Sequence, residues 1–193
     1  MHRGDTVRRT LTHRDRLSGQ ERFVYLHVAR SDEQGIGGNA VVRGGLGPPA
    51  LQRFQRDVLD QPGVRWLIVS EGVNDIGGSR PDSAVTVAQQ LIAAFKDMIS
   101  RAHARGLRVY GATILPFGRS FYSTPEHEAA RQTVNAWIRT SHAFDAVIDF
   151  DSAMRDSVDP KRLRSDADSG DHLHPNENGY RLMAAAIDPA LFR

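Results

Sequence analysis

The most specific polar cluster of this sequence lies near its C-terminus, in Asp171-His172-Leu173-His174-Pro175. On a loop that leads into a helix, the Asp171 carboxylate can reach the Nδ1–H of His174 while Nε2 stays free to accept a proton. This arrangement is the supporting half of a catalytic triad. Two alternatives stay open: His172 and His174 chelate a metal ion together with Asp171, or all three are polar loop residues.

A second segment, Glu71-Gly72-Val73-Asn74-Asp75, follows a short apolar run. From the end of a strand, the Asn74 carboxamide can aim an N–H into a cleft, and the neighbouring glycine lets a substrate approach the backbone closely. Such a group suits the stabilisation of an oxyanion. The alternative is that Asn74 and Asp75 are turn residues whose side chains satisfy their own backbone.

A third segment, Gly35-Ile36-Gly37-Gly38-Asn39-Ala40, is rich in glycine. Its backbone N–H groups can face an anion, and we predict Gly38 as the donor of one N–H to an oxyanion. The string also matches G-x-G-x-x-A, but no helix opens directly after it and no acidic residue ends the next strand at the distance that a dinucleotide site needs. A dinucleotide site is therefore disfavoured, and an inert loop is the alternative.

The elements that must position these segments follow from a regular alternation of helix and strand patterns after Pro48. Short β-rich runs between turn residues predict strands at 65–70, 107–115 and 144–150. Apolar residues at helical spacing, with proline, glycine and capping residues at the ends, predict four helices. These are a helix between Pro48-Pro49 and Pro62, one capped by Asp82 or Ser83 and closed by Gly106, one that begins at Ser123-Thr124-Pro125, and one over 175–187 with Tyr180, Ala184 and Ile187 facing inward.

Strands separated by helices of this length indicate a parallel sheet with helices on both faces, so the sequence predicts a doubly wound α/β sandwich. Ligand sites of such sheets lie at the carboxyl ends of the strands. We therefore expect the three polar segments to meet at one edge of the sheet. Near that edge, Phe117, Phe121 and Tyr122 either line an apolar pocket or pack into the core.

The composition excludes several classes of protein. A chain of 193 residues with 40% apolar and 25% charged residues is typical of one globular domain. It contains no cysteine, which excludes disulfides, thiolate zinc sites and a cysteine nucleophile. Its longest apolar run, residues 182–187, is too short to cross a bilayer.

The first 30 residues are more basic than the rest, with seven arginines against two aspartates and one glutamate. No aromatic residues interleave with these arginines, which favours a solvated terminus over a nucleic-acid contact. No long apolar stretch follows Arg3, as a secretory signal would require. We therefore expect a cytoplasmic protein without a nucleic-acid partner, with secretion left open if residues 1–30 are not the native N-terminus. The oligomeric state is not indicated.

Together the three polar segments resemble those of the SGNH hydrolases, also called GDSL-type esterases and lipases. The resemblance runs from about Gly35 to the C-terminus and predicts a hydrolase-like domain over residues 31–193, preceded by an atypical basic segment over 1–30. It implies a flavodoxin-like sheet. It also implies hydrolysis of an acyl or acetyl ester of a small molecule, carbohydrate or lipid, without a cofactor or a metal.

The resemblance further implies roles for four residues. His174 would act as the general base and Asp171 would orient it, while the Gly38 N–H and the Asn74 side chain would hold the oxyanion. An alternative of a different class is a non-catalytic module of the same fold, which binds an ester-bearing carbohydrate or lipid without cleaving it. A third is a metal-dependent hydrolase that uses His172 and His174.

The sequence departs from the family in the block that carries its nucleophilic serine. No Gly-Asp-Ser block is present; the nearest string is Gly4-Asp5-Thr6, which makes Thr6 the first candidate hydroxyl, ahead of Ser18 and Ser31. The β-methyl of threonine restricts χ1 and would crowd a pocket shaped for serine. The run Phe23–Ala29 either replaces the first strand of the family or is its second strand, with the first absent. Without a positioned hydroxyl the chain would be inactive.

Overall fold

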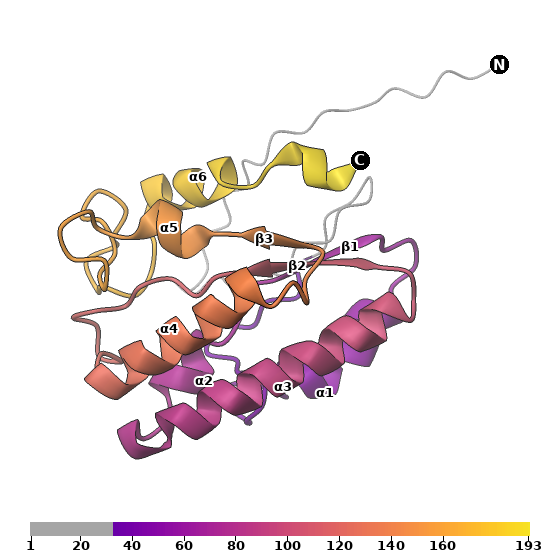
Figure 1. Ribbon diagram of the computed structural model, residues 1–193, viewed down its shortest axis with the longest axis horizontal. Coiled ribbons are helices and arrows are strands. Elements are labelled where there is room, and N and C mark those ends of the chain that lie inside the picture. The colour runs from indigo at the N-terminus through magenta and orange to yellow at the C-terminus, as the bar shows by residue number, and fades with distance from the viewer. Residues whose placement is uncertain (1–32) are drawn as a thin grey trace.

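A parallel sheet forms the middle layer of the computed structural model, which describes residues 33–193 (Figure 1). Its strands are β1 (Trp66–Val69), β2 (Arg108–Ala112) and β3 (Ala146–Ile148), in the order β1-β2-β3. Both pairings are parallel, with Leu67 opposite Val109 and Gly111 opposite Val147. The three predicted strands are thus confirmed, with shorter bounds. The candidate hydroxyls Thr6, Ser18 and Ser31 and the run Phe23–Ala29 lie outside the described residues.

Helices connect and follow the strands in the alternation that the sequence predicts. The α-helices are α1 (Ala50–Phe54), α2 (Val73–Gly77), α3 (Ala84–His103), α4 (Pro125–Thr140), α5 (Phe150–Met154) and α6 (Glu177–Ala185). Three shorter elements adjoin them: a π-helical turn η1 (Gln55–Leu59), and the 3₁₀ turns η2 (Pro81–Ser83) and η3 (Pro189–Phe192).

Helices cover both faces of the sheet, as a doubly wound α/β sandwich requires (Figure 1). On one face, Leu67, Val69 and Val109 join the larger apolar core with side chains of α1, α3 and α4. On the other face, Ile68 and Tyr110 pack with α5, α6 and η3. The alternation of strand side chains between the two cores explains why the centre of each strand is apolar on both sides.

Two of the predicted helix starts differ in outcome. The prediction for α4 is confirmed, because Thr124 Oγ1 accepts the N–H of His127 and Pro125 takes the first helical position. For α3, Ser83 takes the predicted N-cap position, but its side chain makes no capping hydrogen bond. Instead the turn η2 leads directly into the helix, and the Ser83 hydroxyl donates to Asp82, whose carboxylate pairs with Arg80.

The last helix, α6, is shorter than predicted, and one of its three predicted inward residues is exposed. Asn176 caps it by accepting the N–H of Gly179, so the helix begins two residues after Pro175. Of the residues predicted to face inward, Tyr180 and Ile187 are half-buried against the smaller core, whereas Ala184 is exposed. The fully buried positions of the helix are Gly179 and Met183. Within residues 33–193, no helix combines the length and the apolar character that crossing a membrane needs.

Candidate active site

A pocket of about 90 Å³ opens at the carboxyl ends of β1 and β2. Twelve residues line it, from the segments after the two strands, from the histidine loop and from α6: Ser70, Glu71, Val73, Asn74, Thr113, Ile114, Leu115, Leu173, His174, Pro175, Tyr180 and Met183. Two predicted site residues, Asn74 and His174, therefore share one cavity although 100 positions separate them in the sequence. This is the sheet edge at which doubly wound folds bind ligands.

The imidazole of His174 is held by Asp171 in the predicted geometry. His174 Nδ1 lies 2.5 Å from Asp171 Oδ2, and the other carboxylate oxygen accepts the backbone N–H groups of His174 at 2.8 Å and Leu173 at 3.0 Å. One carboxylate thus fixes both the ring and the backbone that carries it. Because Nδ1 is engaged, Nε2 is the nitrogen available for proton transfer.

The charge of Asp171 is stabilised by the same contacts. Partial burial acts to raise the pKa of the Asp171 carboxyl, but hydrogen bonds from the His174 ring, the two N–H groups and Ser169 outweigh it. They hold this pKa well below its usual range, so the carboxylate is ionised throughout the range in which an imidazole titrates. An anion beside Nδ1 stabilises the imidazolium that forms when Nε2 accepts a proton.

A second aspartate–histidine pair lies in the same loop. His172 Nδ1 is 2.6 Å from Asp168 Oδ2, and His172 adopts the left-handed conformation with φ 62°. The other oxygen of Asp168 accepts the N–H groups of His172 and Gly170. Each histidine therefore has its own carboxylate. From residue 33 onward, no three His, Asp or Glu side chains gather into a group that could hold a metal ion.

The Asn74 carboxamide is fixed at both ends. Its Nδ2 donates to the carbonyl oxygen of Asn39 at 2.7 Å, and its Oδ1 accepts the hydroxyl of Tyr122 at 3.0 Å. A carboxamide nitrogen carries two hydrogens, and within the described part of the chain the second makes no hydrogen bond. Asn74 is also one of the residues that line the pocket.

The neighbouring Asp75 joins the glycine-rich segment to α2. Asp75 is 1% exposed, and its carboxylate accepts the N–H of Val41 at 2.8 Å and that of Val42 at 3.0 Å, while Arg43 donates to the Asp75 carbonyl. Burial raises the pKa of this carboxyl, although the two N–H bonds and Arg43 act in the opposite direction. Asn74 and Asp75 therefore bind a distant segment, and the Asp75 carboxylate also interacts with its own backbone N–H.

Gly38 lies beside this junction. It has φ 71°, a left-handed conformation that favours glycine, and a Cβ there would lie 2.5 Å from the end of the exposed Leu46 side chain. The next residue, Asn39, is fully buried, and its side-chain Nδ2 donates to the carbonyls of Leu46 and Pro48. Gly38 is not among the residues that line the pocket, so its place beside Asn74 rests on the bond from Asn74 to Asn39.

The aromatic residues near the sheet edge have three different environments. Phe117 is 1% exposed and belongs to the core, whereas the Phe121 side chain is 76% exposed. Tyr122 donates its hydroxyl to Asn74, a contact that no sequence pattern predicts. The only signal available was an aromatic residue with a hydroxyl in a loop that follows a strand, which is too general to assign a partner.

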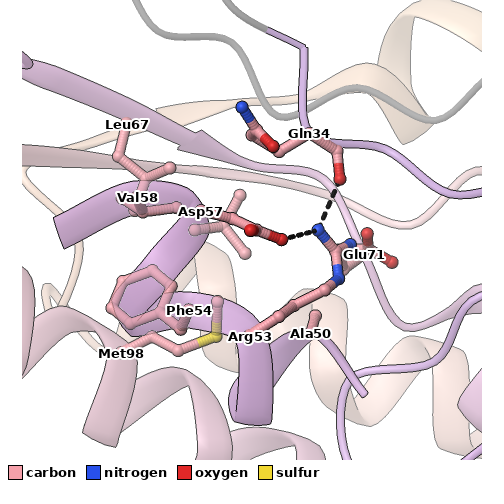
Figure 2. Close-up of a pocket in the computed structure, with 10 residues that line it drawn as sticks. Gln34, Ala50, Arg53, Phe54, Asp57, Val58, Leu67, Glu71 and Met98 are labelled. Carbon is pink, nitrogen blue, oxygen red and sulfur yellow. Dashed lines mark hydrogen bonds and ion pairs between the residues drawn. The ribbon is translucent and has the colours of Figure 1, made fainter. Parts of the chain in front are cut away.

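A second, smaller cavity of about 20 Å³ lies between β1, α3 and the helical turns α1 and η1 (Figure 2). Its lining is mostly apolar, and Arg53 at its wall donates to Asp57 at 2.9 Å and to the carbonyl of Gln34 at 2.6 Å. None of the predicted site residues lines this cavity. The candidate site is therefore the larger pocket that contains Asn74 and His174.

The sequence as a whole matches the model of the GDSL-like lipase/acylhydrolase family over residues 4–182. The chain belongs to this family. The match confirms the resemblance and extends it upstream of Gly35, to the first residue of Gly4-Asp5-Thr6. Membership makes the chain a relative of acylhydrolases, and its pocket at the sheet edge lies where this α/β architecture binds ligands.

Solved structures share the fold of this family member. A Bacteroides fragilis protein described as an acylhydrolase matches with a TM-score of 0.63 at 21% identity, over 82% of this chain and 73% of its own. A GDSL-like lipase from Bacteroides thetaiotaomicron matches with a TM-score of 0.57 at 20% identity, over 74% and 68%. An α/β hydrolase enzyme from the metagenome of Lake Arreo, Spain, matches with 0.55 at 16%, over 80% and 68%. Among curated proteins no sequence relative matches.

Proposed function

We propose that this GDSL-family protein hydrolyses carboxylic esters, with His174 as general base, Asp171 as its orienting carboxylate, and Asn74 and Gly38 as donors to the oxyanion. The observation that carries the proposal is the shared pocket. His174, whose Nδ1 is bound by the Asp171 carboxylate, lines the same cavity as Asn74, whose carboxamide nitrogen carries a second N–H beside the one bound to Asn39. These are the two halves of an acyl-transfer site.

The reaction proceeds through an acyl-enzyme. A hydroxyl oxygen of the chain attacks the ester carbonyl carbon, and its proton passes to His174 Nε2. The negative oxygen of the tetrahedral intermediate accepts the Asn74 and Gly38 N–H groups; one such donor typically contributes about 3 kcal/mol to the transition state. The intermediate then expels the alcohol, which takes the proton from Nε2. Water attacks the acyl-enzyme in the same way and releases the acid.

Thr6 is the proposed source of the attacking hydroxyl. The family match begins at Gly4, the first residue of Gly4-Asp5-Thr6, which is the string most similar to the serine block of the family. A threonine hydroxyl is a competent nucleophile when a base takes its proton, but its β-methyl occupies space beside the carbonyl. We therefore expect slow turnover compared with that of a serine at this position.

The lining of the pocket favours a small apolar acyl group. Val73, Ile114, Leu115 and Leu173 provide apolar walls, and the volume of about 90 Å³ holds only a few small groups. We expect acetyl and butyryl esters to be cleaved with a higher kcat/KM than octanoyl esters of the same alcohol. Equal values for the two classes would count against this acyl specificity.

The test of the proposed function is turnover of a short-chain aryl ester by the full chain. The wild type should release the aryl alcohol, and His174→Ala should lower kcat/KM by at least about 10³-fold. His172→Asn is the matched control, because His172 lies two residues from His174 and its imidazole also pairs with an aspartate, Asp168. Asparagine tolerates the backbone φ of 62° at this position. This variant should retain activity. Equal activity of His174→Ala and the wild type would overturn the assignment of the base.

Two other readings give different outcomes in the same assay. A metal-dependent hydrolase would lose activity in His172→Asn as well as in His174→Ala, and a chelator would abolish its activity until Zn²⁺ was added back. A non-catalytic module, favoured by the absence of serine from Gly4-Asp5-Thr6, would bind an acetylated oligosaccharide and release no acid over hours.

A further inference from the structure

We infer that Tyr122 is a positioning residue for the oxyanion site: its hydroxyl sets the rotation of the Asn74 carboxamide and so the direction of the N–H that a substrate meets. The inference rests on the proposed function for its catalytic consequence. The arrangement itself stands on two hydrogen bonds, one at each end of the carboxamide.

The two bonds require the same orientation of the amide. The Asn39 carbonyl is only an acceptor, so it must face Nδ2, at 2.7 Å. The Tyr122 hydroxyl, at 3.0 Å, donates to Oδ1. Rotating the Asn74 carboxamide by half a turn would place its Oδ1 against the Asn39 carbonyl oxygen, so that two acceptors would face each other. With both ends bound, the plane of the carboxamide is fixed, and the second Nδ2–H keeps one direction relative to the pocket.

The ring of Tyr122 is seated against α2, the helix that carries Asn74. A Cβ on Gly77 would lie 2.1 Å from Cγ of the Tyr122 ring, so the helix presents bare backbone where the ring packs. Asn74 and Gly77 are three positions apart and lie on the same side of this helical turn. The tyrosine therefore packs on the helix and binds the amide from that side.

The backbone of Tyr122 is held independently of its ring. The Tyr122 carbonyl faces Nδ1 of His127 at 2.7 Å, and the Tyr122 N–H donates to the hydroxyl of Ser120 at 3.2 Å. His127 is 3% exposed and also contacts the Ser79 hydroxyl through Nε2, at 3.3 Å. A buried imidazole thus ties the tyrosine loop to the residues that follow α2. Loss of the hydroxyl alone should leave this support in place.

The expected consequence is specific to the transition state. Complete loss of one oxyanion donor typically lowers kcat by about 10²–10³-fold. Tyr122→Phe leaves the donor present but free to rotate, so we expect a smaller loss, about tenfold in kcat with little change in KM. The ground-state carbonyl binds this N–H weakly, which is why KM should be spared.

Tyr110→Phe is the matched control. Tyr110 also donates its hydroxyl to an oxygen of the chain, the carbonyl of Leu191, but on the opposite face of the sheet. Its variant should lose a comparable hydrogen bond and keep the wild-type kcat. In the Asn74→Ala background, Tyr122→Phe should have no further effect on kcat, because the group it positions has been removed. A purely structural role would lower activity in either background.

The experiment combines these kinetics with ¹H–¹⁵N spectra of the full chain. If Tyr122 positions Asn74, the paired side-chain amide signals of Asn74 shift and exchange faster with water in Tyr122→Phe but not in Tyr110→Phe, and kcat falls about tenfold. An unchanged kcat, a tenfold loss that persists in the Asn74→Ala background, or unmoved amide signals would each overturn the inference. If the wild-type chain cleaves no ester, the proposed function fails, and the amide signals alone then decide whether Tyr122 holds Asn74.

Discussion

The carboxylate of Asp75 accepts the backbone N–H of Val41 at 2.8 Å, and this bond joins two segments separated by 34 positions. The second oxygen accepts the N–H of Val42 in the same way. Together with the bond from Asn74 to the Asn39 carbonyl, these contacts place the glycine-rich segment against the asparagine helix. The relative position of the two proposed oxyanion donors therefore depends on a residue that contacts no substrate.

Replacing Asp75 by alanine should destabilise the fold and slow the reaction. Two buried N–H groups would lose their acceptor, and each such loss costs about 1–3 kcal/mol. We expect the free energy of unfolding, measured by urea denaturation, to fall by at least about 2 kcal/mol, with a lower kcat for an aryl ester. Asp82→Ala, an exposed aspartate, is the control. A loss no larger than that of the control would contradict the role assigned to Asp75.

The Asp171→Asn variant should lose activity at every pH tested. Because the pKa of the Asp171 carboxyl lies well below its usual range, the wild-type side chain is an anion across the whole activity profile. An amide cannot stabilise the imidazolium of His174, so kcat should drop by about 10³-fold or more, by a similar factor from pH 5 to pH 8. Asp166→Asn removes an exposed carboxylate in the same loop region and should be neutral. A loss confined to one end of the pH range would argue against this role.

Substitutions at Thr6, Ser18 and Ser31 should show which of these three hydroxyls is the nucleophile. Thr6→Ser removes the β-methyl and keeps the nucleophile, so it should raise kcat, whereas Thr6→Ala should abolish turnover. Ser18→Ala and Ser31→Ala should retain the wild-type rate. Steady-state kinetics with one aryl ester decides between them, and full activity of Thr6→Ala would exclude Thr6 as the nucleophile.

The ion pair between Arg139 and Asp149 should make stability depend on pH in the acid range. Burial acts to raise the pKa of Asp149, but bonds from Arg139, the Ser152 N–H and Thr113 outweigh it and lower this pKa. A lowered pKa adds stability above the unfolded value, which is lost as pH falls through the folded value. Thr113 lines the pocket, so the pair also supports the end of β2.

Unfolding of Arg139→Gln should therefore depend less on pH below pH 4 than unfolding of the wild type. Arg139 pairs with the partly exposed Asp149 and also with the buried Asp151, which keeps Arg131 as a second partner. We therefore expect the variant to lose about 1–3 kcal/mol at pH 7. Denaturant titrations at several pH values measure it. Arg164→Gln, whose partner Asp166 is exposed, is the control and should change little. Parallel pH dependences for Arg139→Gln and the wild type would contradict this account.

The sequence could predict the features that depend on short-range patterns. Thr124 and Pro125 mark the start of α4 because capping and proline geometry act within one turn, and Asp171 reaches His174 because three positions separate them. The inward face of α6 was mispredicted at Ala184, because the cap at Asn176 and the packing of Met183 against β-strand side chains set the rotation of the helix. Local periodicity alone does not fix that rotation.

The contacts that complete the site join residues far apart in the sequence. Tyr122 lies 48 positions from Asn74, and no local pattern distinguishes it from the exposed Phe121 beside it. Likewise, the local sequence around Asp75 is typical of a turn, and only the folded chain places the Val41 N–H within hydrogen-bond distance of its carboxylate. Their roles follow from the packing of loops at the sheet edge, which the order of strands predicts only in outline.

The most direct test of the account is covalent trapping of the nucleophile. A small alkyl phosphonyl fluoride reacts with an activated hydroxyl: the oxygen attacks phosphorus, fluoride leaves, and the base takes the proton. Intact-mass measurement of the full chain should show one adduct in the wild type and none in His174→Ala. Digestion and peptide mapping should place the wild-type adduct on the peptide that contains Thr6. An adduct that forms equally fast without His174 would contradict the claim that this histidine activates the attacking group.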